Sequence, residues 1–327
     1  MLTSIEICAG AGGQALGLEN AGFEHLALVE IDDQACATLK SNRPNWNVLH
    51  QDLKLFKGNE YKNVDLFAGG VPCPPFSVAG KQLGSDDERD LFPEALRLIQ
   101  KIQPKAILLE NVKGLFSPRF DLYRRGILQR LSKLGYWAEW RLINSSDYGV
   151  VQLRPRTILV GFRKELNVEF EWPKPIKNKE TVGELLLDLM SENNWRHAKT
   201  WAKKANKIAP TIVGGSKKHG GPDLGPTRAK LAWAELGVDG SGIADHSPSD
   251  LFVGNPKLTV RMAARIQGFP DSWKFQGKKT AAYRQVGNAF PPPVAFTLGK
   301  AIYKSLLSSH NEEARKVKKS IFQDSEI

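Results

Sequence analysis

The chain has 327 residues, a formal net charge of +11 and three widely separated cysteines, Cys8, Cys36 and Cys73. This length suits one large domain or two unequal ones, and the cysteine spacing argues against a disulfide framework or a cysteine-based zinc site. No stretch approaches the roughly 18 apolar residues of a membrane span, and the N-terminus starts as a strand rather than a signal peptide, so we expect a cytoplasmic protein.

The positive charge is concentrated in one part of the chain. Residues 172–280 contain 18 Lys or Arg against 10 Asp or Glu, a net of +8, and the basic residues are interspersed with tryptophans. A basic, aromatic-rich region favours a polyanionic partner such as nucleic acid, although a solvated basic surface would have the same composition.

The first elements form a strand, a glycine-rich turn and a helix. Residues 4–8 alternate as a short strand, 9–13 are rich in glycine, and 14–20 follow a helical pattern. The next strand, 26–29, ends in Glu30, about 20 positions after the glycines. Such a turn lets a ligand approach the backbone, and the acidic residue suits ribose hydroxyls, although an exposed loop carboxylate would look the same.

A helix is predicted over 33–42 and a short strand over 47–50, which leads to Asp52. Residues 64–68 predict a buried strand that runs into a proline-rich loop carrying Cys73. A thiol on a rigid loop at the carboxyl end of a strand is a candidate nucleophile, and the alternative is a buried apolar cysteine.

The apolar run 106–109 predicts another buried strand, with Glu110 at its carboxyl end. This places Glu110 at the same edge of the sheet as Cys73. A carboxyl group beside an apolar strand end can have a raised pKa and hold a proton, unless local backbone amides satisfy it instead. Helices over 91–102 and 122–134 flank this strand.

Two further strands, 137–143 and 157–162, enclose Arg154 and Arg156, which are suited to binding phosphate or a carbonyl oxygen. The pattern over 1–171 is therefore an α/β fold: a mixed, mostly parallel sheet with helices on both faces.

Residues 172–280 predict a small, irregular, β-rich domain of short strands and long loops, ending in a helix over 257–266. A last helix is predicted over 294–307, and we assign residues 281–310 to the first domain. The charged segment 311–327 predicts a frayed tail.

Six segments occur in the order found in one enzyme family. They are 7–13, the Pro72-Cys73 pair, 110–112, Gln152 to Arg156, 258–270 with Gln-Gly-Phe-Pro, and 285–288. Together they resemble the DNA cytosine-5 methyltransferases, in particular the methylases of bacterial restriction–modification systems. The chain departs from the usual pattern at Cys8, Met262 and Ala289, where phenylalanine, glutamate and serine are frequent.

The resemblance implies a Rossmann-like class I methyltransferase fold that uses S-adenosylmethionine, releases S-adenosylhomocysteine and needs no metal. It implies that Cys73 is the nucleophile, Glu110 the acid at ring nitrogen 3, Arg156 the contact to the base oxygen, and Arg154 a support for the loop or for phosphates. The implied cofactor-binding residues are Cys8, Gly10, Ala11, Gly12, Gly13, Glu30, Ile31, Asp52, Leu53, Pro72, Leu91, Asn288 and Ala289.

The implied substrate is a cytosine flipped out of double-stranded DNA, with the loop 77–89 closing on the DNA and 172–280 acting as a target recognition domain. The candidate DNA-binding residues are Ser77, Lys81, Gln82, Arg89, Lys217, Lys218, Arg228 and Arg261. A monomer with a functionally paired endonuclease is expected. A tRNA methyltransferase of the same fold and a catalytically idle DNA-binding module remain as alternatives.

Overall fold

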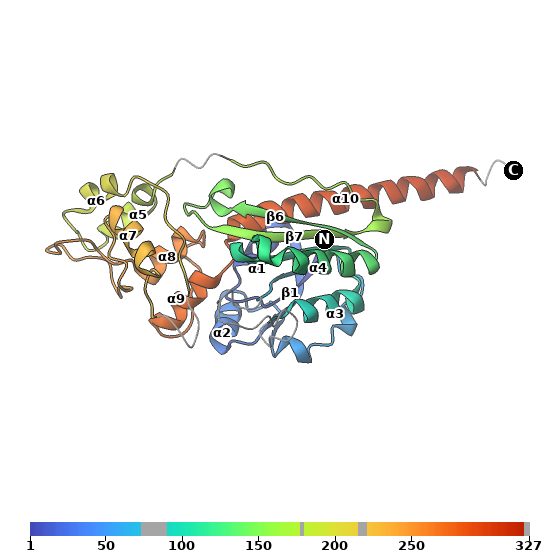
Figure 1. Cartoon of the computed structure of the whole chain (residues 1–327), viewed down its shortest axis with the longest axis horizontal. Coiled ribbons are helices and arrows are strands. Elements are labelled where there is room, and N and C mark those ends of the chain that lie inside the picture. Colours follow the sequence, from blue (N-terminus) through green and yellow to red (C-terminus); the bar gives the residue numbers. More distant parts are fainter. Residues whose placement is uncertain (73–89, 177–179, 215–220, 324–327) are drawn as a thin grey trace.

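The computed structural model describes residues 1–72, 90–176, 180–214 and 221–323, with side chains described to residue 309. A sheet flanked by helices forms the larger lobe, and a set of shorter helices and irregular segments forms a smaller lobe beside it (Figure 1).

Seven strands form one sheet, in the order β3-β2-β1-β4-β5-β7-β6. Their bounds are β1 Leu2–Ile7, β2 Phe23–Glu30, β3 Val48–His50, β4 Leu66–Gly70, β5 Ala106–Val112, β6 Tyr136–Asn144 and β7 Pro155–Arg163. Strands β1 to β5 run parallel, whereas β7 is antiparallel to both β5 and β6. This confirms the mixed, mostly parallel sheet that the sequence predicts.

Helices cover both faces of the sheet, as the sequence predicts. Their bounds are α1 Gly13–Ala21, α2 Asp33–Asn42, α3 Phe92–Ile102, α4 Asp121–Lys133 and α10 Pro292–Gln323. Apolar residues of α1 and α10 pack in one core cluster against β4 and β5, while α3 and α4 share another cluster with Ile5 and Ile7 of β1. Alternate residues of the buried strands thus serve two separate cores, which explains their nearly continuous apolar sequences.

The order of the strands fixes where a ligand can bind. From β1 the chain passes to β2 and β3 on one side and then returns to β4 on the other side. In open α/β sheets, the crevice outside the carboxyl ends of the strands at such a reversal is the usual ligand site. Gly70 of β4 lies beside Glu110 of β5 at this edge.

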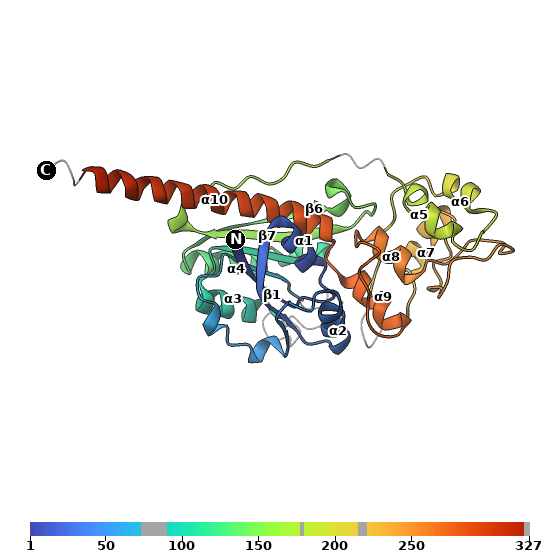
Figure 2. The same ribbon diagram turned by 180° about the vertical axis from the view of Figure 1, so that it is seen from behind.

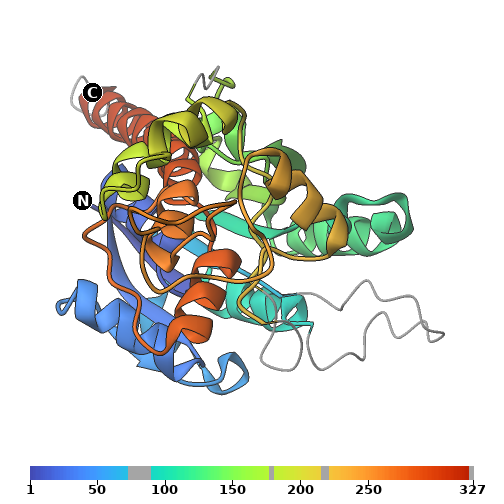
Figure 3. The same ribbon diagram turned by 90° about the vertical axis from the view of Figure 1, so that its left-hand side faces the viewer.

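The smaller lobe is helical, so the expectation of a β-rich region is wrong. Its helices are α5 Val182–Ser191, α6 Ala198–Lys204, α7 Thr227–Glu235, α8 Val260–Ile266 and α9 Lys279–Asn288. Within the described part of 172–280, strand pairing is limited to isolated bridges at Ala209 and between Ala244 and Thr259. Figure 3 shows this lobe from its own end, with its helices and loops in front of the sheet.

The start of α5 carries a helix signal that the sequence reading missed. The Thr181 hydroxyl accepts a hydrogen bond from the Glu184 backbone amide (3.3 Å), and the Glu184 carboxylate accepts one from the Thr181 amide (2.8 Å). This capping box precedes an apolar run with helical spacing, in which Val182, Leu186 and Leu189 are buried.

The tryptophans of this lobe form its core rather than a binding surface. Trp195, Trp201 and Trp233 are at most 5% exposed and belong to one apolar cluster with residues of α5 and α8. Their interleaving with lysines therefore reflects a small core beneath a basic surface.

Helix α10 runs along the sheet and continues beyond it to Gln323 (Figure 2), so the expected frayed tail is helical over much of its length. The segment from 300 to 323 contains neither glycine nor proline, and these are the residues that most strongly end helices. No helix in the described ranges is both long enough and apolar enough to cross a membrane.

Candidate active site at the carboxyl ends of the strands

The turn between β1 and α1 brings the backbone close to the crevice. Gly10 (φ +54°), Gly12 (φ +83°) and Cys8 (φ +51°) all have left-handed backbones. A Cβ atom on Gly13 would lie 2.2 Å from the carbonyl oxygen of Phe290, so only glycine allows α1 to start there. Gly12 and Gly13 therefore shape and pack the turn, whereas Gly10 and Ala11 line a cavity.

Glu30 holds this turn in place. Its Oε2 accepts a hydrogen bond from the Gly10 amide (2.7 Å), and its Oε1 accepts from the amides of Ile31 and Asp32 (2.8 Å each). Glu30, which the sequence predicts to bind ribose hydroxyls, therefore also orders this turn. A carboxylate has about four acceptor positions, so one remains for a ligand hydroxyl.

Two adjoining cavities, of about 250 and 550 Å³, open at this edge of the sheet. They share Cys8, Glu30, Gly70, Glu110 and Asn288 in their linings. Apart from Gly12 and Gly13, every predicted cofactor residue lies in one of the two linings. The smaller cavity has Gly10, Ala11 and Ala289, and the larger one has Ile31, Asp52, Leu53, Pro72 and Leu91.

Glu110 and Arg156 form a buried ion pair between the two strands β5 and β7. Arg156 Nε lies 2.7 Å from Glu110 Oε1, and each side chain is 11% exposed. Burial raises the pKa of Glu110, and the charge of Arg156 opposes that effect. Gly70 lies beside this acid. A Cβ atom at Gly70 would come into contact with Glu110 Oε2, at 3.4 Å, and glycine leaves that space open.

The residues that flank the Cys73 loop are fixed to the same strand end. The Val71 amide donates to the Glu110 carbonyl (3.1 Å), and Asn111 Nδ2 donates to the Val71 carbonyl (2.6 Å). The Leu91 amide donates to the Pro72 carbonyl (3.1 Å), which joins the two ends of the segment. Cys73 itself lies outside the described residues, so its predicted place beside Glu110 stays a prediction.

The chain matches the family of C-5 cytosine-specific DNA methylases over residues 2–304. It belongs to this family. The type II methyltransferase M.NgoMIV of Neisseria gonorrhoeae is 56% identical over 308 residues, covering 93% of this chain and 98% of the relative. M.NaeI of Lentzea aerocolonigenes is 57% identical over 311 residues, covering 93% and 75%. The protein is therefore a DNA cytosine-5 methyltransferase.

Solved structures support the fold. The DNMT2 structure from Spodoptera frugiperda aligns with a TM-score of 0.67 at 20% identity, covering 93% of this chain and all of that one. The Dnmt2 methyltransferase of S. pombe aligns with a TM-score of 0.66 at 17% identity, covering 93% and 99%. These neighbours confirm the class I methyltransferase fold that the sequence predicts.

Arg154 of the methylase does not face the crevice or the surface. Its side chain is fully buried and donates to the carbonyl oxygens of Ile212 (2.7 Å), Gly287 (2.7 Å) and Ala289 (3.0 Å). The expectation that Arg154 could contact phosphates is therefore wrong. Its hydrogen bonds favour the other expected role, that of supporting the loop. It joins β7 to the smaller lobe and to the end of α9.

Two glutamines extend this junction. Gln152 Nε2 donates to Gln267 Oε1 (2.6 Å), and Gln267 Nε2 donates to the Ala289 carbonyl (2.6 Å). Gln152 Oε1 in turn accepts from the Ile212 amide (2.9 Å). These buried amide hydrogen bonds fix three distant segments relative to one another, since each buried polar atom needs its partner.

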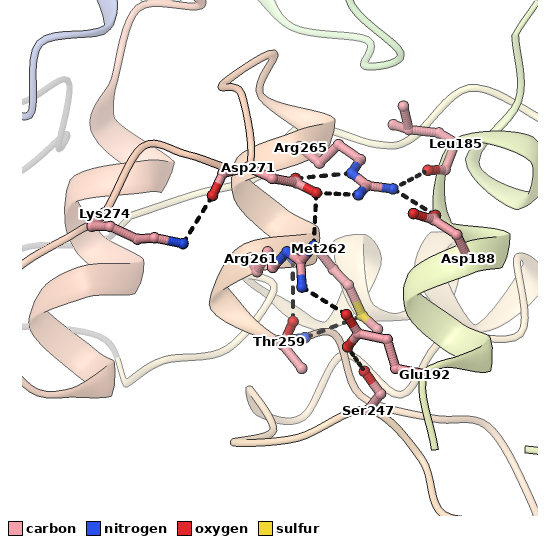
Figure 4. Close-up of polar contacts among 10 residues, drawn as sticks. All are labelled: Leu185, Asp188, Glu192, Ser247, Thr259, Arg261, Met262, Arg265, Asp271 and Lys274. Atoms are coloured by element: carbon pink, nitrogen blue, oxygen red, sulfur yellow. Dashed lines mark hydrogen bonds and ion pairs between the residues drawn. The ribbon is translucent and has the colours of Figure 1, made fainter. Parts of the chain in front are cut away.

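Arg261, a predicted DNA contact, is held within the smaller lobe (Figure 4). Its Nη1 lies 2.6 Å from Glu192 Oε1, and its Nη2 lies 2.9 Å from Asp271 Oδ2. Arg265 also pairs with Asp271 and reaches Asp188 of α5 at 2.5 Å. The two arginines thus hold α8 against α5, and the ion pairs occupy the guanidinium that DNA was expected to contact.

The other predicted DNA-binding residues divide into two groups. Arg228 is exposed on α7, where a phosphate could reach it. The remaining six lie outside the described residues, namely Ser77, Lys81, Gln82, Arg89, Lys217 and Lys218. Among the residues that the structure describes, no group of three or more potential ligands could hold a metal ion.

The sequence reading missed two polar residues of the smaller cavity, Glu6 and Gln14. Both are at most 3% exposed. A charged residue inside the first strand was the available signal, because a carboxyl group is rarely buried without a partner.

Proposed function

We propose that this methylase transfers a methyl group from S-adenosylmethionine to carbon 5 of a flipped-out cytosine in a specific double-stranded DNA sequence. We further propose that it protects host DNA in the bacterial cytoplasm, as part of a restriction–modification system with a separate endonuclease. The observation that carries the proposal is the buried Glu110, which pairs with Arg156 and lines both cavities. The similarity to two type II methyltransferases supports the biological setting.

The lining of the cavities fits S-adenosylmethionine, which supplies an electrophilic methyl group when bound. Glu30 has an acceptor position for a ribose hydroxyl, and Asp52, whose Oδ1 caps the turn at Lys54 (2.9 Å), can accept from an adenine amino group. Cys8, Leu53 and Leu91 supply apolar surface for the base. We assign the larger cavity to the adenosine portion on this basis.

Cys73 is the proposed nucleophile toward the base. Its thiolate forms a bond to ring carbon 6, and the electron pair of the double bond moves to make carbon 5 nucleophilic, with nitrogen 3 taking a proton. Transfer of the methyl group to carbon 5 would leave S-adenosylhomocysteine as the second product. A base then removes the carbon 5 proton, the double bond returns, and the bond between sulfur and carbon 6 breaks to restore the thiolate. Nitrogen 3 returns its proton to Glu110.

Glu110 is the proposed proton donor at nitrogen 3. Burial raises the pKa of its carboxyl, which favours holding a proton until the base arrives. Arg156 positions Glu110 through Nε, while its Nη2, which has no partner among the described residues, can donate to the base oxygen.

The target base must leave the helix to reach a buried acid, so the reaction requires base flipping. The smaller lobe would supply the duplex contacts, with Arg228 as a phosphate contact on its exposed surface. We propose the division into residues 1–171 with 281–310 for catalysis, 172–280 for recognition and 311–327 as a C-terminal extension. A monomer suffices for this scheme.

The test measures transfer of labelled methyl groups to duplex DNA, single-stranded DNA and tRNA. We expect labelling of duplex DNA that contains the recognition sequence, which bisulfite sequencing of DNA from expressing cells would identify. Labelling of tRNA alone would establish the alternative substrate, and no labelling would favour an idle binding module. Either result contradicts the proposal.

The prediction for the nucleophile is that Cys73→Ser abolishes transfer while sequence-specific DNA binding persists, because only the attacking atom changes. Cys36→Ala is the matched control, since Cys36 is buried in α2 and has no proposed role in the reaction. Unchanged turnover in Cys73→Ser would refute the covalent mechanism.

A further inference from the structure

Two polar residues of α2, in the larger lobe, hold the smaller lobe. Thr38 and Asn42 are four positions apart, so they lie on the same side of the helix. That side meets the segment between α8 and α9, and both ribbon views place α2 beside α9 (Figures 1 and 2). Neither residue lines a cavity of the active site, so the chemistry described above gives them no role.

Thr38 is fully buried within a closed ring of hydrogen bonds. Its Oγ1 donates to Gln285 Oε1 (2.6 Å) and accepts from the Gln276 amide (2.8 Å). Gln285 Nε2 in turn donates to the Gln276 carbonyl (2.8 Å). The ring uses the hydroxyl both as a donor and as an acceptor, so an apolar side chain at this position would leave polar groups of the smaller lobe without a partner.

Asn42 makes the second contact between the lobes. Its Nδ2 donates to the Lys274 carbonyl (2.8 Å), and its Oδ1 accepts from the Lys274 amide (2.8 Å). One side-chain amide therefore pairs with both main-chain groups of a single residue. Such a two-point contact fixes the direction of the segment as well as its distance from α2, as paired hydrogen bonds do between antiparallel strands.

These hydrogen bonds are the second of two attachments that hold the smaller lobe. The first joins Gln152 and Arg154, beside β7, to Gln267 and to the end of α9. The two attachments are far apart in the sheet, because α2 connects β2 to β3 near one end of the strand order, whereas β7 lies near the other end. A lobe held at one place can still turn about it, but a lobe held at two separated places has a fixed orientation.

We propose that Thr38 and Asn42 are positioning residues for sequence recognition. By fixing the orientation of the smaller lobe, they set how strictly the enzyme discriminates its recognition sequence from a sequence with one changed base pair. This inference rests on the proposed function, in which the smaller lobe contacts the duplex. A lobe that turns displaces its side chains from the base edges, and discrimination depends on those contacts, since phosphate contacts carry no sequence information.

The test compares kcat/KM for methyl transfer to a duplex with the recognition sequence and to duplexes with one base pair changed. Thr38→Val keeps the shape of the side chain and removes its hydroxyl, and Asn42→Ala removes the amide. Each should lower the ratio of the two kcat/KM values about fivefold, which corresponds to one hydrogen bond. The affinity for S-adenosylhomocysteine, measured by calorimetry, should stay within about twofold. Thr38→Ser keeps the hydroxyl and should keep the wild-type ratio.

Asn47→Ala is the matched control. Asn47 Nδ2 also donates to a main-chain carbonyl, that of Leu26 (2.9 Å), but both residues belong to the larger lobe. The ratio compares two substrates of one enzyme sample, so partial unfolding, which removes active enzyme from both reactions equally, does not change it. An unchanged ratio in Thr38→Val and Asn42→Ala, or an equal fall in Asn47→Ala, would overturn the proposal. Failure of the wild type to methylate any duplex would instead count against the proposed function.

Discussion

Arg154 is the residue whose role the structure changes most, and Arg154→Met tests that role. The side chain donates to three carbonyl oxygens, of which Ala289 also accepts from Gln267 and stays paired. The substitution therefore leaves the carbonyls of Ile212 and Gly287 without this donor. Each unpaired buried carbonyl costs about 1–3 kcal/mol.

Removing the buried positive charge of Arg154 offsets part of this loss of stability. Burial lowers the pKa of Arg154, and the neighbouring charge of Arg156 adds to the effect, so the folded state holds this cation at a cost. We expect the free energy of unfolding to fall by about 3 kcal/mol in total. For a chain of this size the melting temperature should fall by roughly 4 °C.

The assay is urea and thermal unfolding of Arg154→Met beside Arg163→Met. Arg163 ends β7 and pairs with Glu165, which is 67% exposed, so its loss should cost less than about 1 kcal/mol. If Arg154→Met unfolds like the wild type yet loses methyl transfer, the arginine acts on the substrate and the reasoning fails.

Two more predictions concern side-chain contacts away from the pair of Glu110 and Arg156. Trp273→Phe should weaken S-adenosylmethionine binding about fivefold by calorimetry, because the indole N–H donates to the Ala11 carbonyl in the cofactor turn (3.1 Å) and phenylalanine keeps only the packing; an unchanged affinity would rule out this link. Asp271→Asn should lower stability at pH 7 by about 1–2 kcal/mol, since its carboxylate accepts from Arg261 and Arg265. These arginines lower the pKa of Asp271 to about 2 from 3.8, so its contribution is present above pH 3.8 and is lost as the pH falls toward 2. Urea unfolding of both proteins should show the difference shrinking over that range, and a constant difference would contradict the ion-pair explanation.

The sheet and its helices were predictable because each element carries a local signal. The apolar runs at Ala27, Phe67 and Leu108 are buried strands, and Glu30 and Glu110, which follow the first and the last of these runs, lie at one edge of the sheet. In the smaller lobe such signals were fewer, apart from the capping box before α5 and the helical pattern over 257–266. Its helices are short, and its tryptophans look alike in sequence whether they face DNA or a core, so composition alone favoured the wrong interpretation.

The positions of the strand ends in the sequence were not enough to predict the contact between Glu110 and Arg156. Each residue was a candidate by itself, but whether they meet depends on the antiparallel register of β5 and β7, in which Val112 lies opposite Arg156 and Glu110 opposite Ile158. Residues 110 and 112 point to the same face, so Arg156 reaches diagonally to Glu110. A shift of one residue would turn Arg156 to the other face of the sheet and leave Glu110 buried without its cation. Arg154, two residues before Arg156, is in turn fixed to carbonyl oxygens on distant segments, which no local pattern in the sequence reveals.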